Sequence, residues 1–120
     1  MREKRRHKRI PIAASATLRF KNRENSSPID AMVGSISISG IGLYTDKHIE
    51  PNALISLEIK FISVDGSMYN ESTSGRIVYV NVIGGMNYTG IEFDDLINPG
   101  GQPQLYNHLF TVMRSAFDEP

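Results

Sequence analysis

Basic side chains crowd the start of this chain, where Arg2, Lys4, Arg5, Arg6, Lys8 and Arg9 lie within nine residues. Arg5 and Arg9 are four positions apart, and Arg6 stands beside the first of them. Arginine carries a planar, permanently charged guanidinium that binds phosphate or the O6/N7 edge of guanine, and that stacks on a flat base. Three such side chains in five residues could hold a ligand with both guanine bases and phosphates. Arg2 and Arg6 repeat the spacing.

The charge of the chain is unevenly distributed, although thirteen basic and thirteen acidic residues give a formal net charge of zero. Residues 1–9 carry a net charge of +5, so residues 10–120 carry −5. Like charges repel, which predicts that residues 1–11 form a flexible basic arm. A basic arm on an acidic body favours an anionic partner at the arm. A solvated terminus without a ligand is the simpler alternative.

A second feature is the alternation of small hydroxyl side chains at Ser35, Ser37 and Ser39, followed by Gly40. In a strand these serines would share one face, where they could hydrogen-bond a ligand. Gly40 permits a positive φ or a close backbone approach. Strict alternation would also place the apolar residues of 29–33 on the serine face. A β-bulge near Gly34 would remove this conflict.

The sequence indicates no enzyme. His7, His48 and His108 are scattered over an arm, a loop and a helix, and they match no catalytic or metal-binding motif. Asp94-Asp95 is typical of a turn or a helix entry. The chain has no Cys, no phosphate-binding loop and no dinucleotide fingerprint. No apolar run approaches the ~20 residues that span a bilayer, so we expect a cytoplasmic protein without membrane insertion.

The elements that must position these residues are mostly strands. Residues 12–20 and 53–62 alternate apolar and polar side chains, the period of a half-buried strand. Further strands are predicted at 29–38, at 41–44, in a long region ending at 76–80, and at 86–93. Apolar residues then recur at spacings of three and four, which predicts one helix at about 102–117. The sequence therefore predicts a single mainly-β domain over 12–120, a six-stranded antiparallel β-barrel with a C-terminal helix.

Taken together, these segments resemble the PilZ domain family, whose members are receptors for cyclic di-GMP. The family pattern is an R-x-x-x-R arm ahead of the first strand, followed by [D/N]-x-S-x-x-G. Residues 5–9 match the arm, and residues 37–40 match S-x-x-G. Residues 41–43, 75–78 and 90–93 are also similar to the family, so the resemblance covers nearly the whole chain.

The resemblance implies a PilZ-like split barrel. It implies that Arg5 and Arg9 contact guanine and phosphate with help from Arg6, and that Ser37 and Gly40 line the site. Ser35 stands where the family has Asp or Asn. Its shorter side chain would lose a hydrogen bond, which costs about 0.5–1.5 kcal/mol, or up to about tenfold in affinity.

The hypothesis from the sequence is a cyclic di-GMP sensor that orders its arm on binding and signals to a separate protein. One alternative is a nucleotide-independent interaction module with the same fold, since some family members bind no nucleotide. The other is a single-stranded nucleic-acid binder, which usually combines aromatic residues with a basic groove. We expect Tyr44, Tyr79 and Tyr88 not to cluster with Lys or Arg, which disfavours nucleic acid.

Overall fold

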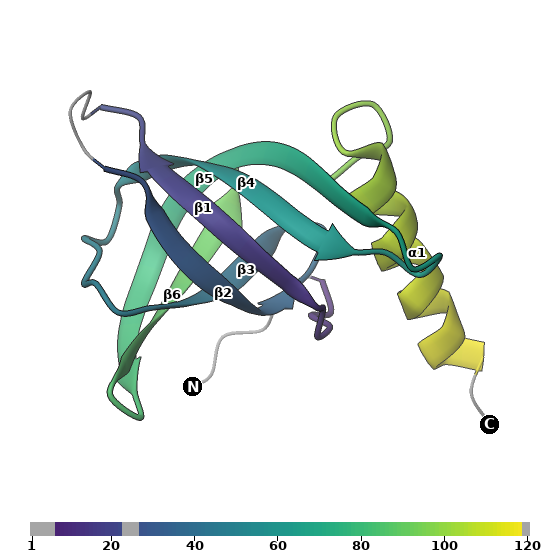
Figure 1. Cartoon of the computed structure of the whole chain (residues 1–120), viewed down its shortest axis with the longest axis horizontal. Coiled ribbons are helices and arrows are strands. Elements are labelled where there is room, and N and C mark those ends of the chain that lie inside the picture. The colour runs from purple at the N-terminus through teal and green to yellow at the C-terminus, as the bar shows by residue number, and fades with distance from the viewer. Residues whose placement is uncertain (1–6, 23–26, 119–120) are drawn as a thin grey trace.

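A computed structural model describes residues 7–22 and 27–118 of the chain. Six strands precede one helix, as Figure 1 shows. The elements are β1 (Ala14–Phe20), β2 (Ile29–Ile36), β3 (Gly40–Thr45), β4 (Leu54–Ile62), β5 (Met68–Ile83), β6 (Met86–Phe93) and α1 (Pro103–Asp118). The predicted elements are all present, with shifted ends. β2 stops at residue 36 instead of 38, and β5 runs for 16 residues.

The strands close into an antiparallel barrel in the order β1-β2-β3-β6-β5-β4 (Figure 1). This confirms the predicted fold class. Alternation along each strand directs apolar side chains into one interior. β4 illustrates this, because Ile55, Leu57, Ile59 and Phe61 are at most 2% exposed. Closure leaves few free strand edges.

A bulge in β2 settles the conflict that strict alternation created. The register with β3 shifts between Val33 and Ser35, so Gly34 is the extra residue. Ala31 and Val33 point into the barrel before the bulge, and Ile36 is fully buried after it. Ser35 is therefore turned away from the interior. The bulge near Gly34 that would remove this conflict is therefore present in the structure.

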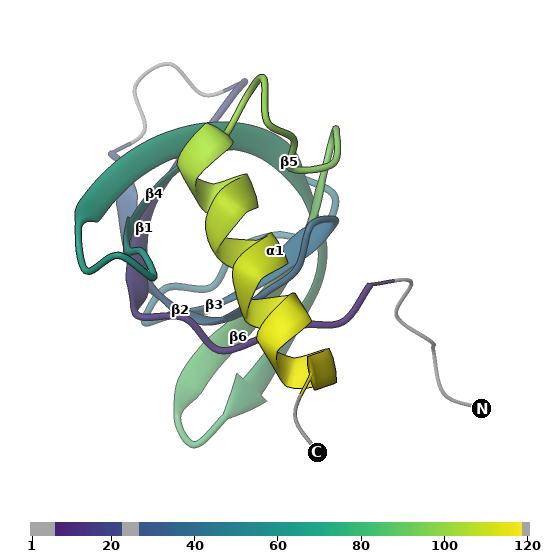
Figure 2. The ribbon, with the colours of Figure 1, turned by 90° about the vertical axis from the view of Figure 1, so that its right-hand side faces the viewer.

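Helix α1 crosses one end of the barrel, as Figure 2 shows. Leu105 and Leu109 are at most 1% exposed and complete the core there. Glu71 of β5 fixes the start of the helix, because its carboxylate accepts hydrogen bonds from the backbone N–H groups of Gln104 (2.9 Å) and Leu105 (2.8 Å). A carboxylate at a helix N-terminus satisfies otherwise unpaired donors and complements the helix dipole.

His108 lies at the interface between the helix and the barrel end, with only 8% of its surface exposed. Its ring is 6.0 Å from that of Phe61, and its Nδ1 has no hydrogen-bond partner among the described residues. Burial disfavours the charged imidazolium and lowers the pKa of His108 below its ordinary value of 6.5.

We expect this histidine to make the domain less stable in mild acid. Above pH 6.5 His108 is neutral in both the folded and the unfolded chain. Below that pH the unfolded chain binds a proton on His108, whereas the folded chain does not. The free energy of unfolding therefore falls with pH until the pH reaches the lower pKa of His108 in the folded chain. Urea denaturation at pH 7.5 and 5.5 measures this loss. His108→Leu should lose less stability over the same interval, and an equal loss in both proteins would contradict the prediction.

Candidate functional site

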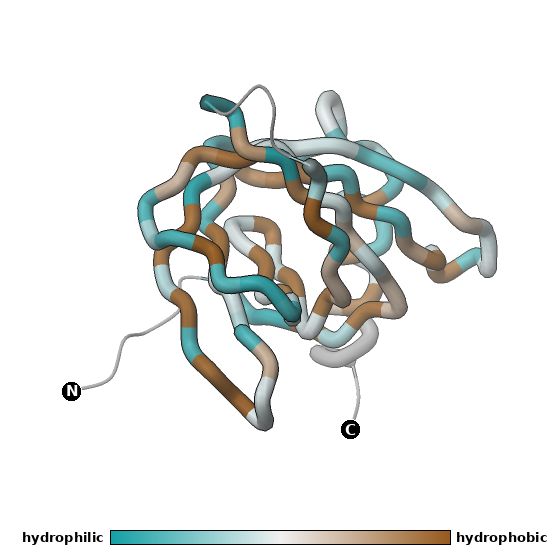
Figure 3. Tube along the Cα trace, turned by 60° about the vertical axis from the view of Figure 1, so that its left-hand side comes forward, coloured by the Kyte–Doolittle hydropathy of each residue, from teal (hydrophilic) through white to brown (hydrophobic). Residues whose placement is uncertain are grey.

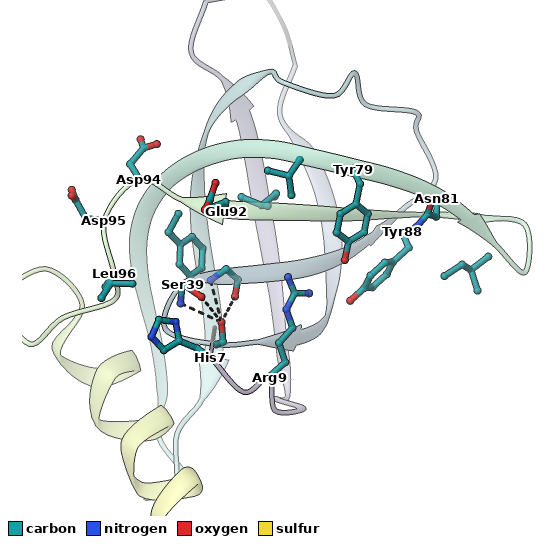
Figure 4. Close-up of a pocket in the computed structure, with 16 residues that line it drawn as sticks. His7, Arg9, Ser39, Tyr79, Asn81, Tyr88, Glu92, Asp94, Asp95 and Leu96 are labelled. Carbon is teal, nitrogen blue, oxygen red and sulfur yellow. Dashed lines mark hydrogen bonds between the residues drawn. The ribbon is translucent and has the colours of Figure 1, made fainter. Parts of the chain in front are cut away.

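A pocket of about 1060 Å³ opens on the outside of the barrel, and Figure 4 shows the side chains around it. Three parts of the chain form its wall: the segment before β1, the turn between β2 and β3, and the outer surface of β5 and β6. The lining includes His7, Arg9, Ser37, Ser39, Gly40, Tyr79, Asn81, Tyr88, Glu92, Asp94 and Asp95. Arg9 of the arginine motif and Ser37 and Gly40 of the serine motif thus meet at one place.

Residue Ile10 fixes the chain ahead of β1 beside this pocket. Its N–H donates to the carbonyl of Ile36 (2.8 Å), and its carbonyl accepts from the N–H of Ile36 (2.9 Å). The Ile10 side chain is 5% exposed and belongs to the core. Pro11 restrains the following backbone. The preceding residue, Arg9, is therefore held against the barrel wall, whereas the predicted site residues Arg5 and Arg6 lie outside the described residues.

The guanidinium of Arg9 reaches over β3. A Cβ atom placed on Gly42 would lie 3.0 Å from Arg9 Nη1, and one placed on Gly40 would lie 3.6 Å from Nη2. Arg9 Nη1 is buried and has no hydrogen-bond partner among the described residues. A buried charged donor without an acceptor is costly, and an anionic ligand in the pocket would relieve that cost. This geometry leaves Arg9 Nη1 able to donate to an acceptor in the pocket.

Two tyrosine rings, those of Tyr79 and Tyr88, lie beside Arg9, and the ring of Tyr44 packs against Tyr88. The rings of Tyr44 and Tyr88 have centroids 4.8 Å apart, and those of Tyr79 and Tyr88 are 6.3 Å apart. Tyr79 and Tyr88 line the pocket together with Arg9, and Figure 4 shows the guanidinium pointing toward both rings. The expectation that the tyrosines stay apart from basic side chains is wrong. Tyr79 and Tyr88 lie on the two strands of one hairpin, but Arg9 is about seventy residues earlier in the chain, so only the tertiary structure brings it beside them.

Gly42 provides the space that Tyr88 and Arg9 share. A Cβ atom at this position would lie 1.9 Å from the Tyr88 hydroxyl oxygen, closer than any real contact. We predict that Gly42→Ala pushes the Tyr88 ring away from Tyr44 and disturbs Arg9, while the barrel stays folded because the far end of a side chain can move. The change should appear as altered tyrosine fluorescence with little loss of helix and strand signal in circular dichroism. An unchanged tyrosine environment would contradict this prediction.

Ser37 has a different position from the one that alternation predicted. Because β2 ends at Ile36, Ser37 begins a turn and does not share a strand face with Ser35. Its Oγ accepts hydrogen bonds from the backbone N–H groups of Ser39 and Gly40, both at 3.2 Å. Ser37 is only 3% exposed. Its hydroxyl thus shapes the turn that forms the floor of the pocket.

Gly40 and Ser39 complete this turn. A Cβ atom on Gly40 would lie 2.6 Å from the backbone oxygen of Ile91, so the glycine allows the close approach of β3 and β6. Ser39 also lines the pocket; it was among the serines expected to hydrogen-bond a ligand, but not among the site residues that the family resemblance implied. The alternating serines were the signal that indicated it.

Comparison with known proteins identifies the fold. The family model for the PilZ domain matches residues 3–110. This chain belongs to the PilZ domain family. Its structure is similar to that of the Bacillus subtilis inhibitor of motility (MotI/DgrA), with a TM-score of 0.72 at 11% identity; the match covers 98% of this chain and 54% of that one. This chain therefore spans about half the length of that protein.

A second solved structure is a PilZ domain of YcgR from Escherichia coli with c-di-GMP, which this chain resembles with a TM-score of 0.64 at 13% identity, covering 95% of both chains. No curated protein matches the sequence. Among the described residues of this PilZ domain, no group of three acidic, His or Cys side chains could hold a metal ion. Nor do they include a helix with the length and apolarity to cross a bilayer.

The position where this PilZ domain departs from the family pattern is beside the tyrosines. The Ser35 Oγ lies 3.5 Å from the hydroxyl of Tyr88, and Ser35 is half-buried. It is not among the residues that line the pocket. Ser35 therefore contacts the pocket wall only through the hydroxyl of Tyr88, which does line the pocket.

The opposite end of the pocket in this PilZ domain is acidic. Glu92 is paired with Arg76 (3.1 Å), and Asp94 lies 3.6 Å from Lys21. Ser74 also donates a hydrogen bond to Asp94 (3.1 Å). These carboxylates are partly neutralised, and Asp95 adds a further one at the same end. The pocket thus joins a cationic, aromatic end to an end rich in hydrogen-bond acceptors.

Proposed function

We propose that this PilZ domain binds cyclic di-GMP in the pocket and acts by binding, without catalysis. The observation that carries the proposal is the buried, unpaired Nη1 of Arg9 beside the rings of Tyr79 and Tyr88. A guanidinium suits a phosphate or the O6/N7 edge of guanine. Tyrosine rings suit the flat face of a base. Support also comes from the family and from the E. coli PilZ domain whose structure was solved with c-di-GMP.

Each part of the pocket has a proposed role. Arg9 would contact phosphate or guanine, and Arg5 and Arg6 would add charge-assisted hydrogen bonds from the arm. Tyr79 and Tyr88 would pack against a purine. The turn that Ser37 and Gly40 shape would let the ligand approach the backbone closely, and Ser35 would orient Tyr88.

The proposed output is a change in the surface shown to a separate protein. A ligand with two phosphates would neutralise part of the net charge of +5 on residues 1–9. Binding would draw the arm across the pocket, so that the arm and the β5–β6 surface would form one face. A partner that recognises this face would respond to the ligand. In this way the domain would serve as a sensor of the ligand and an adaptor for the partner protein.

Titration calorimetry of the wild-type domain with cyclic di-GMP tests the proposal. GTP serves as a control for guanine and phosphate chemistry, and a single-stranded oligonucleotide tests for a nucleic-acid binder. We expect saturable binding of cyclic di-GMP that exceeds the other two. At a ligand concentration a hundredfold above Kd the free energy of unfolding should rise by about 2.7 kcal/mol, which raises Tm by several degrees.

No heat of binding and an unchanged Tm would favour a nucleotide-independent interaction module. Binding of the oligonucleotide alone, falling steeply with salt, would favour nucleic acid.

A further inference from the structure

Strand β5 has one open edge where it extends beyond the barrel. Its pairing with β4 ends at Arg76, opposite Leu54. Ile77 makes the last bonds on that side, since its N–H donates to Ala53 (3.0 Å) and its carbonyl accepts from Asn52 (2.7 Å). Among the described residues, 79–83 pair only with β6. Figure 3 shows this hairpin standing clear of the barrel, with a largely hydrophobic β5 arm.

The backbone groups at this edge can be assigned from the turn. Gly84 and Gly85 have positive φ and join Ile83 to Met86 as a two-residue hairpin loop. The closing pair of such a loop is hydrogen-bonded, and antiparallel residues alternate between facing the partner strand and facing away. Val80 and Val82 therefore direct their N–H and C=O groups toward the open edge.

The side chains of the hairpin give this edge no protection. Residues 77–91 contain no charged residue and no proline. Val82 is 74% exposed and Ile83 is 50% exposed. Natural sheet edges usually carry lysine, proline or inward-pointing charge, because an exposed apolar edge pairs with other strands. An edge without these features is suited to a partner strand.

We propose that the β5 edge of one copy pairs with the β5 edge of a second copy to form a two-fold dimer. Two identical strands meet here without opposing like charges, because residues 79–83 are uncharged. Placing the two-fold axis at Asn81 sets Val80 opposite Val82 of the other copy, which forms about four backbone hydrogen bonds. A two-fold contact uses the same patch on both copies and closes after two, so it does not grow into a fibre.

This pairing would place the second copy beside the pocket. Tyr79 and Asn81 line the pocket and belong to the strand that carries the open edge. The side chains of the added strand would therefore extend the pocket wall. The dimer does not depend on the identity of the ligand, so it can be tested without any nucleotide.

Sedimentation equilibrium of the wild-type chain and two variants tests the proposal. Val82→Lys places a charge at the edge of each copy, where two lysines would repel. Val64→Lys is the matched control, because Val64 is 50% exposed on the β4–β5 hairpin, away from the edge. We expect a dimer for the wild type and for Val64→Lys, and a monomer for Val82→Lys. A monomeric wild type, or a dimer that survives Val82→Lys, would overturn the proposal.

Cysteine cross-linking tests the register independently. The chain contains no Cys, so a single introduced thiol reports on one position. In the proposed register Asn81 faces itself in a non-hydrogen-bonded pair, with Cα atoms about 4.5 Å apart, a spacing that a disulfide can bridge. Asn81→Cys should form a covalent dimer rapidly on mild oxidation, and Val64→Cys should not. Equal cross-linking of both variants would show random collision and contradict the register.

Discussion

Arg9→Ala is expected to weaken the binding of cyclic di-GMP by about tenfold to a hundredfold or more. Hydrogen bonds that involve a charged group contribute about 1.5–3 kcal/mol each, and every 1.4 kcal/mol is a factor of ten in Kd. Of the two arginines of the R-x-x-x-R motif, Arg9 is the one that the structure describes. Its Nη1 is buried and has no hydrogen-bond acceptor among the described residues. Titration calorimetry at fixed salt measures the loss.

Two further variants separate the shape of the guanidinium from its charge. Arg9→Lys keeps the charge but loses the planar fork, so it should recover only part of the affinity. Arg19→Ala removes the same charge from an exposed position on β1, away from the pocket lining, and should bind as the wild type does. If Arg9→Ala bound cyclic di-GMP as tightly as Arg19→Ala, the pocket would not be the nucleotide site.

Phe61→Ala is expected to cost the domain about 3–5 kcal/mol of stability, the usual range for a buried phenylalanine. Phe61 is 1% exposed and lies where the end of β4 meets the helix. Its ring is 6.0 Å from both Tyr69 and His108. The cavity left by alanine would remove the support for His108 and loosen α1. Urea denaturation at pH 7.5 measures the change in free energy.

Phe110→Ala is the matched control for that substitution. Phe110 lies on helix α1 but is 51% exposed, and its ring stacks on that of Tyr106 with centroids 6.1 Å apart. Surface substitutions usually change stability by at most about 0.5 kcal/mol, and loss of an aromatic pair adds about 0.5–1.5 kcal/mol. Phe110→Ala should therefore cost clearly less than Phe61→Ala. Similar losses would mean that the barrel end does not close around Phe61 as described.

The bulge in β2 shows which features of this strand the local sequence pattern predicts and which depend on the tertiary structure. Alternation alone placed Ser35 and Val33 on one face, and it was the burial of Val33 that required an extra residue near Gly34. The pattern thus indicated where a bulge would remove the conflict. It could not reveal that β2 ends at Ile36, because Ser37 leaves the strand only when its hydroxyl binds the backbone of Ser39 and Gly40. Side-chain bonds within a turn compete with strand pairing and do not follow its period.

The sequence by itself determined the strands, the single helix, and the presence of an arginine motif and a serine-glycine motif. Each of these depends on periodicity or on neighbouring residues, which are local properties. Only the tertiary structure decided that Arg9 meets Tyr79 and Tyr88, and that β5 keeps an open edge at residues 79–83. Those contacts join segments about seventy to eighty residues apart. Their positions follow from strand register and barrel closure, which no local pattern contains.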